Sequence, residues 1–135
     1  MELQNNFTIL NILLLQSEFK RTLDVNSDSS LLKTPIHIDI NLDIKDNIIN
    51  VKEVFTFKSI HNGVEQVSCR IEMLGVFQAN CSNDNNIYEK FGQINGPAII
   101  YPYIRETFSS LCMKAGLIGI YLSPMNFTSY KPQHK

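Results

Sequence analysis

Cysteine is scarce in this sequence, and the few cysteines lack the spacing of a metal site or a disulfide framework. The 135 residues include three, Cys69, Cys81 and Cys112. An odd number without close pairs fits neither a zinc knuckle nor a disulfide scaffold. We therefore expect reduced thiols in a cytoplasmic protein. Cys69 and Cys112 are interpreted as core residues, and Cys81, in a polar loop, is the better candidate for a reactive thiol.

An excess of charge of one sign is also missing. The chain carries 12 Lys plus Arg and 13 Asp plus Glu, which gives a formal net charge of −1. Nonspecific binding to nucleic acid depends on neutralising many phosphates with basic side chains. The balance of charge therefore disfavours nucleic acid as a partner.

Long apolar runs are absent as well. The apolar run at residues 12–15 is bounded by Asn11 and Gln16, whereas a membrane-spanning helix needs roughly 18 apolar residues. Glu2 stands where a signal peptide would have basic residues. We expect neither membrane insertion nor secretion.

The sequence contains no motif that predicts catalysis or metal binding. His37, His61 and His134 lie in different regions without a Glu or Cys at metal-ligand spacing. No Gly-x-Ser-x-Gly elbow and no Gly-rich phosphate loop is present. The adjacent Arg105 and Glu106 are typical of a solvated helix face. We expect no cofactor and no metal, and an enzyme is the least favoured of the functional classes.

Length and composition predict one domain. A chain of 135 residues with 44% hydrophobic and 19% charged residues is typical of a soluble domain with its own core. We expect a single domain over residues 1–135, which ends in a short polar tail at about 131–135.

Alternation of apolar and polar residues predicts a sheet. Three stretches, 36–45, 49–58 and 67–73, alternate with a period of two. Turn residues at 46–47 and 61–63 separate them, so the three stretches should form an antiparallel meander. Residues 7–19 are apolar on both faces, and we expect such a strand to be covered on both sides. Residues 20–34 and 81–86 are predicted as surface loops.

The period changes to that of a helix after Pro97. The apolar residues that recur at steps of three and four are Tyr101, Ile104, Phe108, Leu111, Cys112 and Ala115. Gly116 is a natural stop. The following stretch, 117–124, is apolar but interrupted by Gly and Pro, which indicates an extended segment laid against the body of the protein.

More apolar surface is present than one sheet and one helix need. It lies in residues 7–15, on the predicted helix and in the last segment. An oligomer interface and a groove for extended apolar polypeptide are both consistent with this excess.

Three motifs resemble the SecB-type protein-export chaperone family. Gly75-Val76-Phe77 is similar to a strand-ending family motif, residues 99–106 (Ile-Ile-Tyr-Pro-Tyr-Ile-Arg-Glu) to its helix signature, and residues 123–127 (Ser-Pro-Met-Asn-Phe) to a segment beyond the helix. Their order and separation agree with the family. The resemblance extends weakly back to Phe7 and Ile9 and so covers nearly the whole chain.

The resemblance implies an α+β fold and a defined assembly. The fold is a SecB-like four-stranded antiparallel β-meander packed with one long C-terminal helix, and the assembly is a homotetramer built as a dimer of dimers. The residues then expected at or near oligomer interfaces are Phe7, Ile9, Val67, Cys69, Ile71, Met73, Ile104, Phe108 and Leu111.

The resemblance also implies ATP-independent holding of unfolded polypeptide in apolar grooves. The residues expected to line the groove are Leu13, Leu15, Phe55, Phe57, Phe77, Ile100, Tyr101, Met125 and Phe127. The alternatives are a dedicated chaperone of one client, such as an antitoxin, and a non-chaperone oligomeric scaffold or ligand-binding module. Exposure of Leu13, Ile100, Met125 and Phe127 in the assembled state would favour the chaperone.

Docking on the export motor SecA is less expected than the holdase activity. The family docks through an acidic sheet face and a C-terminal tail. Gln16, Lys20 and Arg70 stand at positions that align with acidic docking residues, and loss of opposite charge weakens attraction to a basic partner. The chain also ends at Lys135, soon after the last motif, and we expect it to lack the family's last helix and acidic tail.

Overall fold

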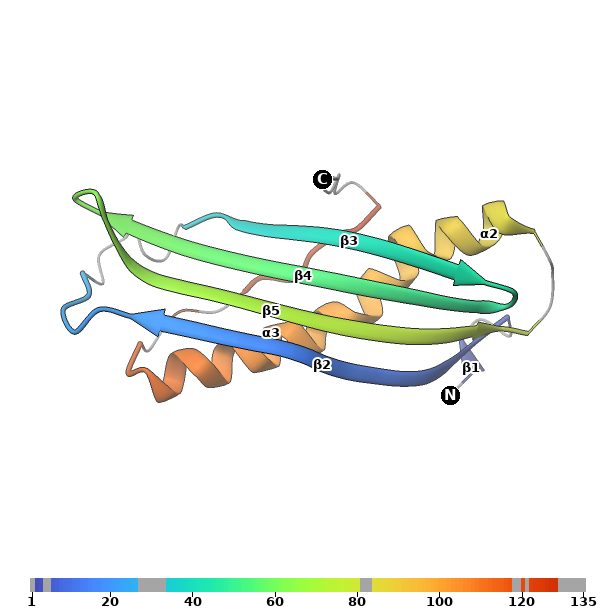
Figure 1. The fold of residues 1–135 in the computed structure, drawn as a ribbon, viewed down its shortest axis with the longest axis horizontal. Coiled ribbons are helices and arrows are strands. Elements are labelled where there is room, and N and C mark those ends of the chain that lie inside the picture. The colour runs from blue at the N-terminus through green and yellow to red at the C-terminus, as the bar shows by residue number, and fades with distance from the viewer. Residues whose placement is uncertain are drawn as a thin grey trace.

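A sheet of long antiparallel strands and a long helix on one of its faces form two layers (Figure 1). The structure is a computed structural model, and it describes residues 2–3, 6–26, 34–80, 84–117, 120 and 122–128. In chain order the elements are β1 (Glu2–Leu3), β2 (Phe7–Arg21), β3 (Ile36–Lys45), β4 (Ile48–His61), β5 (Val64–Ala79), α2 (Asn85–Lys90), the π-helical segment η1 (Phe91–Asn95) and α3 (Gly96–Lys114).

The sheet confirms the predicted fold class. The strands lie in the order β1-β2-β5-β4-β3, and all pairs are antiparallel. Two-residue turns join β3 to β4 and β4 to β5, and Asp46, Asn62 and Gly63 have the positive φ that such turns require. The meander therefore comprises β3, β4 and β5, while β2 lies beside β5 on the other side of the sheet.

Two bulges explain the apolar residues on both faces of β2. The register with β5 shifts between Ile9 and Asn11 and again between Leu14 and Gln16, so Leu10 and Leu15 have no partner on β5. Each extra residue reverses the alternation of the strand. The expectation that this strand is covered on both sides is wrong for the single chain, because its leucines at 10 and 13–15 remain 39–52% exposed.

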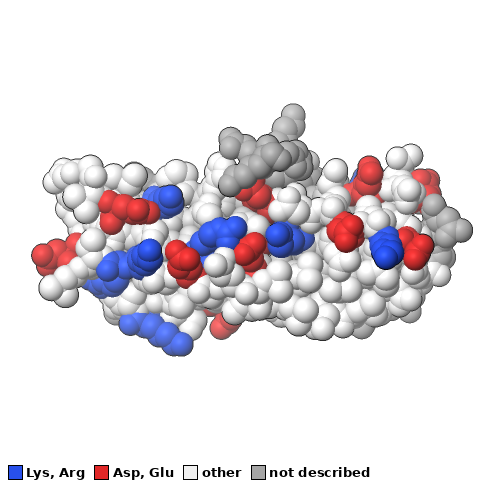
Figure 2. Space-filling view, in the orientation of Figure 1, with Lys and Arg blue, Asp and Glu red and all other residues white. Residues whose placement is uncertain are grey.

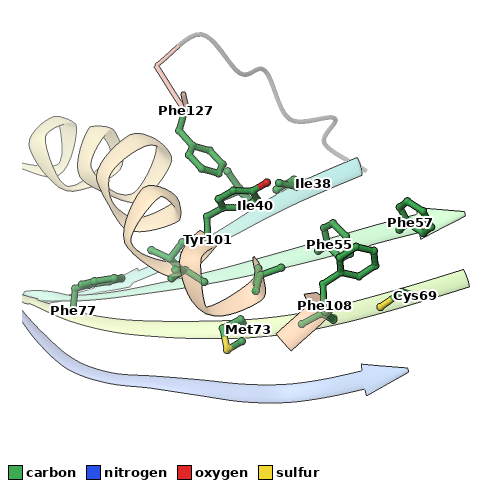
Figure 3. Packing of buried hydrophobic residues seen from close by; sticks show 14 of the residues in the cluster. Ile38, Ile40, Phe55, Phe57, Cys69, Met73, Phe77, Tyr101, Phe108 and Phe127 are labelled. Atoms are coloured by element: carbon green, nitrogen blue, oxygen red, sulfur yellow. The ribbon is translucent and has the colours of Figure 1, made fainter. Parts of the chain in front are cut away.

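The core lies between the sheet and α3. Ile100, Ile104, Phe108 and Cys112 recur every four residues along α3, and all four are buried against the sheet. The ring of Phe108 contacts the rings of two β4 phenylalanines, with centroid distances of 5.1 Å to each (Figure 3). These contacts hold the helix on the sheet through apolar burial.

Gly75 allows the helix to approach the sheet closely. A Cβ atom at this position would lie 2.7 Å from a ring carbon of Phe77 and 2.8 Å from Cδ1 of Ile100. Any larger residue would therefore force the helix or these side chains to move. This contact gives a physical reason for glycine in the motif Gly75-Val76-Phe77.

The limits of α3 agree with the sequence, but the elements before it were not predicted. The helix has Pro97 in its first turn and ends just before Gly116, whose φ is 74°. Upstream, the predicted loop at 81–86 is wrong at its end, because Asp84 accepts a hydrogen bond from the Asn86 amide and caps α2. The first three residues of that predicted loop lie outside the described residues.

The π-helical segment η1 connects the start of β2 to the helix layer. The ring of Phe91 in η1 stacks on the ring of Phe7, with a centroid distance of 3.9 Å, and also contacts Phe77. Contacts between residues so far apart in sequence have no local signature. A periodicity analysis therefore misses this segment.

Candidate functional site

The groups that could carry covalent or metal chemistry are scattered or unreactive. Among the described residues, no three His, Cys, Asp or Glu side chains form a group that could hold a metal ion. Cys69 and Cys112 are free and buried, and burial raises the pKa of Cys69 to about 12 and that of Cys112 to about 11. Both thiols are therefore protonated near neutral pH and poor nucleophiles. Cys81 and His134 lie outside the described residues.

No helix in the described part of the chain combines the length and the apolar character needed to cross a membrane. The described part of the chain has two apolar surfaces.

The first such surface is the leucine edge, which we define as Leu10, Leu13, Leu14 and Leu15 of β2. The two-residue strand β1 pairs with β2 only at Phe7 and Thr8, so from Ile9 onward the outer side of β2 is a sheet edge in the described part of the chain. Exposed leucines on such an edge are unusual, because natural proteins commonly place charged side chains on edge strands. Unpaired backbone groups and apolar side chains together favour contact with another polypeptide.

The second surface is the part of α3 and β3 on which the end of the described chain packs. We call the described residues 120 and 122–128 the C-terminal strap. They form no helix or strand, yet Ile120 and Phe127 are buried and Leu122 and Met125 pack on the core. The described residues of the segment predicted after Gly116 therefore lie against the body, as expected.

Tyr101 of α3 holds the strap at two points. Its hydroxyl donates a hydrogen bond to the Ser123 carbonyl at 2.8 Å. Its ring meets the ring of Phe127 edge-on, with a centroid distance of 5.7 Å. Figure 3 shows this ring pair beside Ile40 and Ile38 of β3. The strap thus packs beside α3 and β3.

The structure divides the residues predicted for the client groove into three places. Leu13 and Leu15 lie on the leucine edge. Tyr101, Met125 and Phe127 meet where the strap contacts α3. The remaining four are buried beneath the helix: Phe55, Phe57, Phe77 and Ile100. Exposure of Leu13, Ile100, Met125 and Phe127 was expected to indicate a client groove. In the single chain Leu13 is the most exposed of the four, whereas Ile100 is 0% and Phe127 5% exposed.

The residues predicted for oligomer interfaces are used mainly inside the single chain. Those that are buried in its core are Phe7, Val67, Cys69, Ile71, Met73, Ile104 and Phe108, while Ile9 and Leu111 are partly buried. Buried side chains have no apolar surface left for a second chain. The exposed apolar residues on the outer face of α3 are instead Tyr103 and Met113, which are 50% and 72% exposed in the single chain.

The open face of the sheet, opposite α3, carries Gln16, Lys20 and Arg70, the three residues that align with docking positions of the family. Arg70 donates a hydrogen bond to the side-chain carbonyl of Gln16 and forms an ion pair with Glu72 at 2.9 Å. Lys52 approaches the same carboxylate at 3.7 Å, and the hydrogen bond from Arg70 lowers the pKa of Glu72. Lys20 follows farther along β2 on this face. Figure 2 shows both signs of charge interspersed along the described part of this face.

Glu53 is a buried carboxyl group that the periodicity analysis overlooked. It lies on the helix side of β4, between Ile40 on β3 and Met73 on β5, and is 0% exposed. Neither carboxylate oxygen has a hydrogen-bond partner among the described residues, and burial raises its pKa to about 9. A signal was present in the sequence, because Glu53 interrupts the alternation of Ile49, Val51, Phe55 and Phe57.

Comparison with known proteins agrees with this architecture. Residues 18–135 match the family model described as preprotein translocase subunit SecB. The chain is similar to the protein-export protein SecB of Methylobacillus flagellatus, with 35% identity over 65 residues, which are 48% of this chain and 41% of the relative. It is also 31% identical to that of Chromobacterium violaceum over 67 residues, which are 50% of this chain and 44% of the relative. These matches span less than half the length of the curated relatives.

A solved structure shows the same fold. It is the SecB-like chaperone of Mycobacterium tuberculosis in complex with a ChAD peptide from the HigA1 antitoxin. The TM-score is 0.75 with 15% sequence identity, and the match covers 90% of this chain and 91% of the other.

Proposed function

The chain belongs to the SecB family, and from this membership we propose that it is an ATP-independent holdase, which binds unfolded or aggregation-prone polypeptide through apolar surface. The observation that carries this proposal is the leucine edge, with four leucines that remain 39–52% exposed in the single chain. A holdase needs affinity without a strict sequence requirement. Apolar burial provides such affinity because it does not depend on direction.

The leucine edge is large enough to matter energetically. Covering the exposed half of one leucine contributes roughly 1 kcal/mol. Four leucines together correspond to a change in Kd on the order of a thousandfold, before the cost of ordering the client is subtracted.

Assembly with further copies is part of the proposed function. The backbone groups on the outer side of β2 are suited to pair with β2 of a second copy, while the leucine side chains project from the two faces of the strand and stay available to clients. Tyr103 and Met113, on the outer face of α3, would then join two such dimers into a tetramer. Gel filtration with light scattering of the purified protein tests this assembly.

A single dedicated client, such as an antitoxin, is the second candidate. The mixed charge around Arg70 and Glu72 favours it over export, because a basic module of SecA finds no acidic face to bind. The solved neighbour, bound to an antitoxin peptide, also supports it. We place the protein in the cytoplasm, in keeping with its free cysteines. Crosslinking in native cells followed by pull-down distinguishes SecA, one antitoxin and many clients.

Aggregation of a chemically unfolded client protein tests the holdase activity. We expect the wild-type protein to suppress light scattering. The double variant Leu13→Asp/Leu15→Asp should bind roughly thirtyfold more weakly, since about 2 kcal/mol of apolar burial is lost. Leu23→Asp is the matched control, because Leu23 is 91% exposed but lies outside the leucine edge. Failure of a stoichiometric amount of wild-type tetramer to suppress aggregation would leave an oligomeric scaffold as the better interpretation.

A further inference from the structure

Asparagine is followed by glycine at two places in the chain, Asn62-Gly63 and Asn95-Gly96. Asparagine is a chemically labile residue, and a following glycine makes it more so. Because glycine has no Cβ, its backbone nitrogen can closely approach the side-chain amide of the asparagine before it. The two pairs are the same dipeptide, so the backbone around each pair decides whether it reacts in the folded protein.

Asn62 and Gly63 form the two-residue turn between β4 and β5. Their φ angles are 52° and 75°, the positive pair that a tight hairpin turn requires. Both residues are exposed, and a Cβ atom added to Gly63 would have nothing within 4 Å. In the described part of the chain, neither the Asn62 side chain nor the Gly63 amide has a hydrogen-bond partner. Both reacting groups are therefore open to water.

The end of this hairpin is weakly held. Ile60 and Val64, close to the turn on either strand, are 63% and 56% exposed, so they bury little apolar surface. The register of β4 with β5 also shifts between Ser59 and Ile60, which marks a bulge. Firm contacts begin at Gln66, whose buried side chain bonds to the Ser59 hydroxyl and to the Asn26 backbone. Rotation of the turn into a reactive geometry therefore costs little free energy.

Asn95 and Gly96 lie in the opposite situation, where η1 meets α3. Both have helical φ and ψ angles, and the Gly96 amide donates a hydrogen bond to the Phe91 carbonyl. Gly96 is buried, and a Cβ atom there would lie 3.0 Å from Cγ2 of Val51. The nitrogen of Gly96 is thus held in the helix, and it reaches the Asn95 side chain only if this part of the core opens.

We propose that Asn62 is a site of spontaneous deamidation and that Asn95, in the same dipeptide, is protected. The backbone nitrogen of Gly63 forms a bond to Cγ of Asn62, the bond from Cγ to Nδ2 breaks, and ammonia leaves with the proton of the Gly63 amide. Water then opens the cyclic imide. Cleavage at Cγ gives aspartate, and cleavage at the backbone carbonyl carbon gives isoaspartate. Each route consumes one water molecule and involves no oxidation or reduction.

The two products affect the hairpin differently. Aspartate fits the turn, since Asp46 has a φ of 56° as the first turn residue between β3 and β4. Isoaspartate carries the backbone through its side-chain carbon and so adds one atom to the turn. Because turn length fixes the register of a hairpin, this product should disturb the strand pairing up to the bonded pair Ser59 and Gln66. Both products add a negative charge next to the exposed Glu65.

Peptide mapping of the aged protein tests the proposal. Trypsin, which cleaves after lysine and arginine, places Asn62 and Asn95 in separate peptides, 59–70 and 91–105. The folded full-length protein is incubated in mildly alkaline buffer, and each peptide is monitored for a gain equal to the mass of water minus that of ammonia. We expect peptide 59–70 to gain this mass at least about tenfold faster than 91–105, because the helix must open before Asn95 reacts. In concentrated urea the two rates should become similar.

The variant Asn62→Gly assigns the reaction to its residue. Glycine keeps the positive φ of the turn and has no side-chain amide, so peptide 59–70 of this variant should keep its mass. Equal rates at Asn62 and Asn95 in the folded protein would overturn the proposal, as would a mass gain that persists in Asn62→Gly. A folded protein in which Asn62 stays intact, over a time in which the urea-unfolded chain reacts, would also overturn it. None of these outcomes depends on the holdase activity.

Discussion

Replacement of Glu53 by glutamine should stabilise the protein, and the gain should grow with pH. Glutamine has nearly the shape of the protonated acid but cannot ionise. In the wild type, the raised pKa of about 9 means that folding at pH 7 requires Glu53 to take up a proton. The unfolded chain, with an ordinary pKa of 4.5, has already lost it. Each pH unit above this value corresponds to about 1.4 kcal/mol.

The expected difference at pH 7 is about 3 kcal/mol in the free energy of unfolding, in favour of Glu53→Gln. Below about pH 3.5 the difference should vanish, because both states of the wild type then hold the proton. Urea unfolding of both proteins at several pH values measures this directly, and equal m-values would show that the unfolded states are comparable.

The pattern across pH is more informative than a single value. A constant difference between wild type and variant would indicate that a packing change, not proton uptake, is responsible. A wild type that is more stable than Glu53→Gln at about pH 8 would refute the reasoning, since a buried carboxylate without partners lowers stability most where the unfolded chain is ionised.

Two further predictions concern the core. Phe108→Ala should lower the free energy of unfolding by about 3–5 kcal/mol, because it removes a fully buried ring from the contact between α3 and β4. Glu106→Ala, on the exposed face of the same helix, should change it by less than about 0.5 kcal/mol, and similar losses in urea unfolding would contradict this account of the core. Gly75→Ala should cost about 1–3 kcal/mol, because its Cβ would lie 2.7 Å from a neighbouring ring carbon, and an unchanged thermal midpoint would mean that the helix shifts without penalty.

The leucine edge illustrates how strand geometry decides which apolar residues of a sequence stay at the surface. The apolar residues of β2 follow no single face because two bulges reverse the alternation at Leu10 and Leu15. A regular strand with the same composition would bury one set of side chains under α3. The bulges instead leave leucines exposed at the edge of the sheet, where another polypeptide can reach both the side chains and the backbone.

Local patterns in the sequence were sufficient for most of the elements. Alternation with a period of two located β3, β4 and β5, and the residues at 46–47 and 62–63 located their turns. Steps of three and four residues located α3, and Gly116 marked its end. These signals are local because backbone conformation and the choice of buried face depend mainly on neighbouring residues.

The tertiary structure decided what local patterns do not encode. Contacts between residues far apart in the chain place β2 beside β5, pack η1 on Phe7 and hold the strap against Tyr101. The same holds for the role of each apolar residue. Phe108 and Leu13 are both apolar residues in the sequence, but the packing of α3 on the sheet buries the first and leaves the second exposed.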